Sequence, residues 1–340
     1  MVMAKVRPFL ALSLAAAMLA ACAGEGAQDS SEATAEDPMV LMLAHNLSTD
    51  HVTSVALSDF ADMVEENTDG RITVQIYPNG QLGSETEVIE QLRADILDMT
   101  RVSAPGLSGY NEGYHAFGLP YIFDDQEHYY ASMDSDEMRE FFMSSYDDGF
   151  VGLTYYTSGS RSFYANKEIR TPDDLKGMKI RVQDMRSQTD MMHALGGTPV
   201  VIPFGDIYTS LQTGIIDGAE SNETALTQSS HGDVSKIFSY DEHSMIPDML
   251  IMSTATWDSL SAEDQDAIIE AAIESTEAHK IAWDEEIEAA KIEAEEEMGV
   301  TFIEDVDKEA FQEATAPMID QYVSEYPLVG DVLDIVEGAR

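Results

Sequence analysis

The chain has 340 residues, of which 44% are hydrophobic and 24% charged, so it can bury a sizeable core and we expect two domains. It carries 64 Asp and Glu against 18 Lys and Arg, a net charge of −46. This excess argues against nucleic-acid partners, because their phosphates would be repelled. The acids are spread along the whole chain, which is typical of proteins from salt-loving organisms, where salt screens self-repulsion. An acidic surface that binds a basic partner is the alternative.

The N-terminus has the pattern of a targeting segment. Residues 1–21 combine a short positively charged start with an apolar run that is too short to span a bilayer comfortably. The run ends at Cys22, the only cysteine, directly after small residues, which resembles the lipobox of bacterial lipoproteins. We predict that Cys22 becomes the lipid-modified mature N-terminus and that the acidic residues 22–37 form a flexible tether. A coincidental cysteine after an ordinary signal peptide is the alternative.

Strands and helices alternate in the first half of the folded part. Period-two runs indicate strands, and capped segments with helical spacing indicate the helices between them. The β-α-β-α-β order at the start predicts an α/β lobe with a largely parallel sheet. In chain order, the expected elements are strand 39–44, helix 50–67, strand 71–77, helix 85–93, strand 96–103, helix 124–148 and strand 151–156.

The second half repeats this logic and then changes to a long helix. A helix over 261–298 has no Pro or Gly, and at ~1.5 Å per residue it measures roughly 55 Å, more than one lobe needs. Its apolar positions make no single stripe, which favours a helix that spans two lobes; two helices with a bend near Trp283 are the alternative. The elements expected before it are strand 178–182, a helix ending at 196–197, strand 199–202, helix 205–212 and strand 215–220.

One window of this acidic chain is positively charged. Between Arg161 and Arg186, seven Lys and Arg stand against four acids, a net +3. Arginine suits a carboxylate because its planar fork donates two parallel hydrogen bonds. The alternation of residues 178–182 places Arg181 opposite the apolar face, and Gln183 at the strand's carboxyl end, where open α/β sheets bind ligands. The alternative is that Arg181 is a solvated surface charge.

Catalytic and metal motifs are not found. The chain has no Gly-x-Ser-x-Gly elbow and no P-loop, and its eight histidines form no His-x-x-x-His pair. Carboxylate pairs such as Glu85 and Glu87 carry little weight among 64 acids. We therefore expect no metal and no cofactor.

From about Val40 to Glu325 the chain resembles the extracytoplasmic solute-binding proteins of TRAP transporters, the DctP-like family. The runs that carry this resemblance are 78–83, 98–103, 119–123, 171–182 and 211–220. The resemblance implies an α/β, two-lobed periplasmic-binding-protein-like fold with a ligand cleft at the hinge and a long helix spanning both lobes. It also implies capture of an organic acid by closure of the lobes. We expect lobe I at 38–157 plus 248–285 and lobe II at 158–247 plus 286–340.

The resemblance also assigns residues. The family's arginine that pairs with the ligand carboxylate falls on Arg181, and a second family arginine falls on Arg161. Where the family usually has two consecutive Asn, this chain has Ser221 and Asn222. Either Ser221 substitutes with its shorter hydroxyl, or Asn222 takes over the polar contact.

Uronate-binding members look similar at further positions, which favours a sugar acid over a C4-dicarboxylate. His51 would donate to a ligand hydroxyl, Glu85 would accept from one, and Arg101 would add a third cation. The alternatives are structural: His51 starts its helix, Glu85 favours a helix N-terminus, and Arg101 neutralises acids such as Asp98. In full, the predicted ligand-binding residues are Arg181, Arg161, Arg101, Asn222, Ser221, Gln183, Glu85, His51, Asn46, His45 and Phe204.

The resemblance implies a role in transport rather than catalysis. We expect an extracytoplasmic monomer, anchored to the membrane through Cys22, that passes a uronate or a C4-dicarboxylate to the membrane subunits of a TRAP transporter. The alternative is an extracytoplasmic enzyme acting on a small anionic substrate, which would need a catalytic constellation that the sequence does not show.

Overall fold

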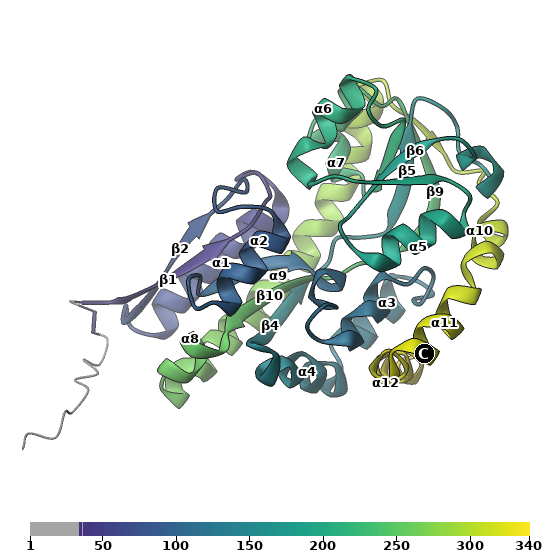
Figure 1. Cartoon of the computed structure of the whole chain (residues 1–340). Helices are drawn as coiled ribbons and strands as arrows, with labels where there is room; N and C mark the ends of the chain where they lie inside the picture. The colour runs from purple at the N-terminus through teal and green to yellow at the C-terminus, as the bar shows by residue number, and fades with distance from the viewer. Residues whose placement is uncertain (1–33, 36) are drawn as a thin grey trace, which may run out of the picture. The chain divides into compact units, whose positions relative to one another are not determined.

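The computed structural model describes residues 34, 35 and 37–340, which fold around two β-sheets (Figure 1). The predicted signal peptide, Cys22 and most of the predicted tether lie outside the described residues. Within the described part, no helix combines the length and apolarity that a membrane span requires.

The first sheet has the strand order β2-β1-β3-β10-β4. The parallel strands β1 (Met39–Ala44), β2 (Ile72–Tyr77) and β3 (Met99–Ser103) alternate with helices α1 (Val52–Asn67) and α2 (Glu85–Arg93), which confirms the predicted β-α-β-α-β unit. The sheet is completed by β4 (Phe150–Tyr156) and β10 (Asp248–Ser253), and β10 is antiparallel to both β3 and β4. A strand from a distant part of the sequence therefore lies between β3 and β4.

The second sheet has the order β11-β9-β5-β8-β6-β7. Strand β6 is parallel to β7 and β8, whereas β5 is antiparallel to β8 and β9. The strands are β5 (Arg161–Ala165), β6 (Lys179–Val182), β7 (Thr198–Val201), β8 (Gly218–Ser221), β9 (Ile237–Ser244) and β11 (Thr301–Ile303). The helices of this part are α5 (Arg186–Ala194), α6 (Ile207–Gln212) and α7 (Thr224–Thr227).

The single helix expected over 124–148 is wrong, because the segment contains an internal helix start. It divides into α3 (Gln126–Met133), α4 (Asp136–Met143) and a 3₁₀ turn at Ser144–Asp148. Ser135 caps α4, its side chain accepting a hydrogen bond from the Met138 backbone N–H. A serine that satisfies a free N–H in this way favours a new helix start over continuation.

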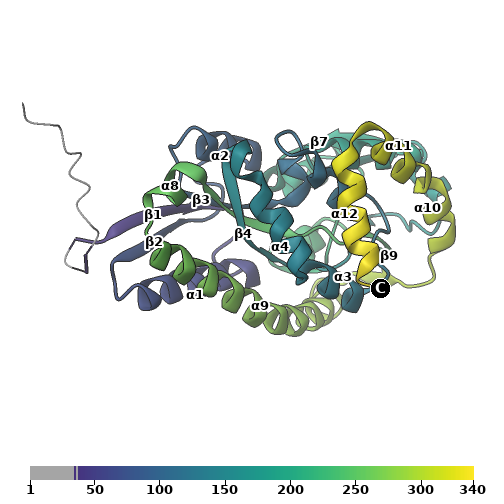
Figure 2. The same ribbon diagram turned by 90° about the horizontal axis from the view of Figure 1, so that it is seen from below.

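The long helix α9 (Ala262–Glu296) is one 35-residue helix, as its lack of Pro and Gly predicted, and it does not divide near Trp283. Its first half packs in the core of the first sheet through Ile268 and Ala272, whereas Ala294 lies in the core of the second sheet. Figure 2 shows α9 running beside α1, and near its other end it contacts α7. The change of packing partner explains why its apolar positions form no single stripe.

The remaining helices are α8 (Thr254–Ser259), α10 (Lys308–Thr315), α11 (Pro317–Glu325) and α12 (Pro327–Gly338). Helix α10 contacts β9, whereas α12 lies against α3, α4 and the 3₁₀ segment Glu112–Gly118, which come from the range expected for lobe I (Figure 2). The lobe bounds remain a prediction.

Three connections join the two sheets in the described chain. They are residues 157–160 between β4 and β5, residues 245–247 between β9 and β10, and the α8–α9 stretch between β10 and β11. These are called the sheet connections below.

Candidate functional site

A cavity of about 480 Å³ is lined by residues that precede or follow strands of both sheets. Asn46, Glu85 and Ser103 come from the first sheet's side, and Arg161, Arg181 and Gln183 come from the second sheet. This volume lies in the range of sites for small molecules. We call this cavity the cleft.

Arg181 is the central cation of the cleft. It lies in β6 between Ile180 and Val182, which join the core, so the predicted alternation of faces is confirmed. The side chain is 3% exposed, and its Nε donates to the Ile202 carbonyl oxygen at 2.8 Å. Burial lowers the pKa of Arg181. Among the described residues it forms no ion pair, so its guanidinium charge has no contacting carboxylate.

Arg161 is held by a buried acid. Its Nε donates to Glu220 Oε2 at 2.6 Å and its Nη2 to Glu220 Oε1 at 3.0 Å. His243 lies on the far side of this carboxylate, with its Nε2 3.5 Å from Glu220 Oε2 and its Nδ1 2.8 Å from Asp241 Oδ2. Burial alone would raise the pKa of Glu220, but Arg161 and His243 lower it to about 2. The charge of Arg161 is therefore balanced within the protein.

Arg101, in β3, is the third arginine near the cleft and is also balanced. Its Nη1 donates to Asn46 Oδ1 at 3.1 Å and to Glu85 Oε1 at 3.2 Å, and its Nη2 pairs with the buried Asp248 carboxylate. The structural alternative, in which Arg101 neutralises acids, named Asp98 as an example, but Asp98 instead accepts from the Met42 N–H and the Thr256 hydroxyl. The antiparallel placement of β10 beside β3 brings Asp248 to Arg101.

The two predicted histidines are neutral at pH 7 and serve the local fold. Burial, and then the charge of Arg101, lowers the pKa of His45 to about 4 and that of His51 to about 3. His51 is the N-cap of α1, where its Nδ1 accepts from the Thr53 N–H at 3.1 Å. Its Nε2 lies 3.4 Å from Thr224 Oγ1, which belongs to the second sheet's side. His51 thus contacts both parts of the fold, and neither histidine is among the residues lining the cleft.

Polar contacts also cross the cleft at Gln183. Its Nε2 donates to Ser103 Oγ at 2.9 Å, while its Oε1 is buried and has no hydrogen-bond partner in the described chain. At the end of β8, the Asn222 amide is occupied: Nδ2 donates to the Ser158 carbonyl at 2.8 Å, and Oδ1 accepts from Thr224. Ser221 is buried beside it, and Phe204 lines the cleft's second-sheet wall.

The positively charged window does not act as one cluster. Of its seven cations, Arg161 and Arg181 line the cleft, while the others face solvent. Arg186, for example, pairs with Glu325, and Lys176 pairs with Asp173 at 2.6 Å. The structure therefore gathers Arg181, Arg161, Arg101, Glu85, Asn46, Gln183 and Phe204 at or beside the cleft.

Five acids at the site are absent from the predicted ligand-binding residues. Glu220 and Asp248 balance two arginines, and Glu87, Asp184 and Asp206 line the cleft. Glu220 and Asp184 stand next to predicted residues, so adjacency was an available signal. No local sequence signal pointed to Asp248, because only the pairing of β10 with β3 brings it near Arg101.

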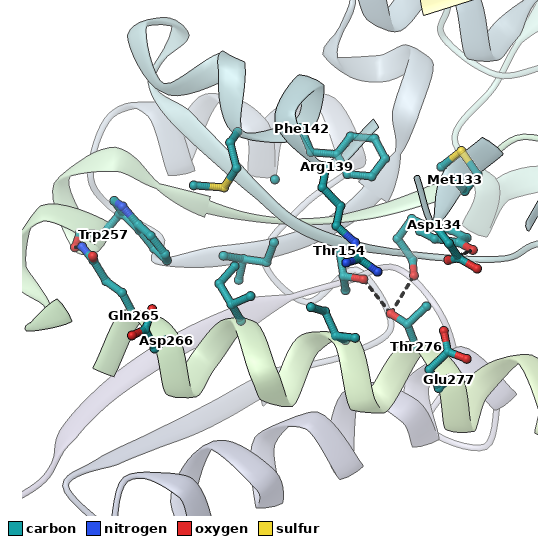
Figure 3. Close-up of a pocket in the computed structure, with 16 residues that line it drawn as sticks. Met133, Asp134, Arg139, Phe142, Thr154, Trp257, Gln265, Asp266, Thr276 and Glu277 are labelled. Atoms are coloured by element: carbon teal, nitrogen blue, oxygen red, sulfur yellow. Dashed lines mark hydrogen bonds between the residues drawn. The ribbon is translucent and has the colours of Figure 1, made fainter. Parts of the chain in front are cut away.

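A separate cavity of about 310 Å³ lies between α9 and the α4–β4 side of the first sheet (Figure 3). Figure 3 shows Trp257 at one end and Asp134 at the other, with Arg139 reaching in between them. Its lining has one arginine against three acids, Asp134, Asp266 and Glu277. That arginine, Arg139, is half-exposed and lies 3.9 Å from Asp136, whereas the cleft contains the buried Arg181, which has no ion-pair partner among the described residues, so the cleft is the candidate site for an organic acid.

Relatives support this assignment of the fold. The chain is 43% identical to the protein YiiZ of Salmonella typhimurium over 78% of this chain and 81% of that protein. Two solved TRAP periplasmic solute binding proteins superimpose on it. One, from Anaerococcus prevotii with bound glucuronate, has a TM-score of 0.85 and 34% identity and covers 88% of this chain and 98% of its own. The other, from Xanthobacter autotrophicus with bound galacturonate, has a TM-score of 0.84 and 34% identity, and the match covers 88% of this chain and 100% of that one.

A family model described as DctP, bacterial extracellular solute-binding protein, family 7, matches residues 43–325. The match includes all strands of both sheets except the start of β1, and it includes the residues gathered at the cleft. The chain therefore belongs to the DctP family of bacterial extracellular solute-binding proteins.

Proposed function

We propose that this protein captures a sugar acid of the hexuronate class, such as glucuronate or galacturonate, outside the cytoplasm and delivers it to the membrane subunits of a TRAP transporter. The observation that carries the proposal is the buried Arg181, whose charge has no contacting carboxylate in the described chain. A ligand carboxylate that supplies this partner gains a charge-assisted, bidentate pair away from water.

The charge balance of the cleft favours one carboxylate over two. Arg101 already contacts Glu85 and Asp248, and Arg161 already contacts Glu220. Asp184 and Asp206 add negative charge to the lining. The second carboxylate of a C4-dicarboxylate would meet these acids, whereas the hydroxyls of a uronate would donate to them. This supports a monocarboxylate with several hydroxyl groups.

One buried polar atom of the lining fits such a hydroxyl. Gln183 Oε1 is an acceptor and has no hydrogen-bond partner in the described chain. A buried polar group without a partner costs about 1–3 kcal/mol, so a ligand that pairs it gains selectivity over one that does not. Because the Asn222 amide is occupied by Ser158 and Thr224, we propose that Ser221 takes the place of the family's first Asn.

We also propose that the protein is not an enzyme and is a lipid-anchored monomer. The lipobox-like sequence that ends at Cys22 supports the anchor. Against the enzyme alternative stands the lining of the cleft: among the described residues it contains no His, Cys or Lys, and its Ser84, which contacts Glu87, serves as the N-cap of α2.

A ligand screen of residues 23–340 tests the proposal. We expect glucuronate and galacturonate to raise the melting temperature, glucose to leave it unchanged, and succinate to raise it less. A ligand at about 100 times its Kd adds ~2.7 kcal/mol of stability. Mass spectrometry after prolonged incubation should recover the uronate unaltered and in equal amount with the protein. A larger shift with succinate than with either uronate, or conversion of the uronate, would overturn the proposal.

A further inference from the structure

A second polar cavity, of about 690 Å³, lies against the sheet connections. Its wall includes Gly159 of the first connection, Met245 of the second and Trp283 of the third. It shares no lining residue with the cleft. A molecule bound there would contact every segment that joins the two sheets in the described chain. We call it the connection cavity.

The connection cavity is strongly acidic. Six acids line it, and the one lining cation, Lys308, is paired with the acid Glu242. Asp124 has Arg340 as a partner at 3.1 Å, whereas the other four acids form no ion pair among the described residues. A hollow with this excess concentrates cations. The six acids are Asp124, Asp125, Glu223, Glu242, Asp284 and Glu288.

Buried polar groups form part of its wall, which distinguishes it from an acidic surface. Ser244, at the end of β9, lines the cavity, is 3% exposed, and its hydroxyl has no hydrogen-bond partner in the described chain. Glu223 is 7% exposed and accepts a hydrogen bond from the Tyr240 hydroxyl at 2.8 Å. A ligand donor that reached the Ser244 hydroxyl would remove the cost of leaving it unpaired.

The lining indicates an organic cation rather than a metal ion. In the part of the chain that the structure describes, no three His, Cys, Asp or Glu side chains are close enough together to hold a metal. The acids instead come from four segments of the chain, and the same lining contains Tyr121, Tyr240 and Trp283 and the apolar Ile287. Aromatic faces attract ammonium groups, and apolar side chains accept the hydrocarbon between them.

We propose that the connection cavity is a binding site for a linear di- or polyamine. Its ammonium groups would reach acids from different elements: Glu223 at the N-terminus of α7, and Asp284 and Glu288 on α9. Four acids without an ion-pair partner in one cavity of about 690 Å³ favour a ligand with more than one positive charge over a single monovalent cation.

The test is a calorimetric titration of residues 23–340 with 1,4-diaminobutane at low ionic strength, and with 1,4-butanediol as the uncharged analogue. The variant Asp284→Asn/Glu288→Gln removes two exposed charges from the cavity. Its matched control, Glu65→Gln/Glu66→Gln, removes two exposed charges from α1. Ser244→Ala tests the buried hydroxyl separately, and circular dichroism melting checks that each variant is folded.

We expect saturable binding of one diamine per chain, none of the diol, and a Kd that rises about tenfold in the cavity variant and less than about twofold in the α1 variant. Ser244→Ala should weaken binding by about threefold. Absence of saturable diamine binding in the wild type, or equal weakening by both paired variants, would overturn the proposal, because diffuse attraction to an acidic surface would then suffice.

Discussion

Arg181→Ala removes the buried guanidinium that we propose pairs with the ligand carboxylate. Arg181 is 3% exposed and has one hydrogen bond to the Ile202 carbonyl, so a ligand pair there forms away from water. Losing one partner of a buried ion pair costs about 3–5 kcal/mol. At about 1.4 kcal/mol per tenfold change, the Kd for glucuronate should rise roughly a hundredfold to several thousandfold.

Calorimetric titration at neutral pH measures this change, and Arg186→Ala is the matched control. Arg186 lies in the same positively charged window, but it is part-exposed and pairs with Glu325 outside the cleft. Its loss should change the Kd by less than about threefold. Arg181→Lys keeps the charge without the planar fork, so we expect an intermediate loss of about tenfold. If Arg181→Ala is folded and binds glucuronate within about tenfold of the wild type, the proposed carboxylate pairing is refuted.

Three further predictions concern selectivity, pH and the long helix. Glu85→Gln removes an acid that lines the cleft, so the affinity for succinate relative to that for glucuronate, both measured by calorimetric titration, should rise about tenfold. An unchanged ratio would contradict the proposal that acids in the cleft disfavour a second carboxylate. Burial lowers the pKa of His45 to about 4 and that of His51 to about 3. The stability that these neutral histidines contribute is therefore fully present at pH values above the ordinary histidine pKa of 6.5, and it is lost as the pH falls toward the lowered pKa values. The free energy of unfolding in urea should therefore decrease as the pH falls below 6.5, by up to ~1.4 kcal/mol per pH unit for each histidine. The variant His51→Asn, which keeps an N-cap acceptor, should reduce this slope. Equal slopes in the variant and the wild type would contradict the role given to His51. Ile268→Ala, at a fully buried position of α9, should lower the free energy of unfolding by about 2–5 kcal/mol in the same assay. Ile281→Ala, at a position 69% exposed on the same helix, should lower it by less than ~0.5 kcal/mol. Similar losses in the two variants would contradict the packing described for α9.

Local patterns were sufficient to predict most helices and strands. The capping serine before α2, the alternation in β2 and the uninterrupted run of α9 each act within a few residues, and the structure has these elements near the predicted bounds. The segment 124–148 failed because an internal capping serine is also compatible with a continuous helix. The antiparallel β10 could not be placed, since its neighbours β3 and β4 are far away in the sequence.

The charge window was a weaker guide to the site than the family resemblance. Lys179 and Arg181 stand on the same face of β6, about 6.6 Å apart along the strand, yet Lys179 is exposed at its start and Arg181 is buried at its carboxyl end. A charge count cannot separate these positions. Likewise, the resemblance offered Arg101 as a third cation for the ligand, with neutralisation of nearby acids as the alternative, and in the structure Asp248 and Glu85 balance its charge. The partners of a charge depend on strand pairing, which the local sequence does not encode.

The most direct test of the proposed function is a calorimetric titration of residues 23–340 with glucuronate and, in parallel, with succinate. We predict one glucuronate per chain and a Kd at least about tenfold lower than that for succinate, because one buried arginine has no contacting carboxylate while the other two arginines are already paired with acids. Folded protein that binds succinate more tightly than glucuronate, or that binds neither, would contradict the hexuronate assignment.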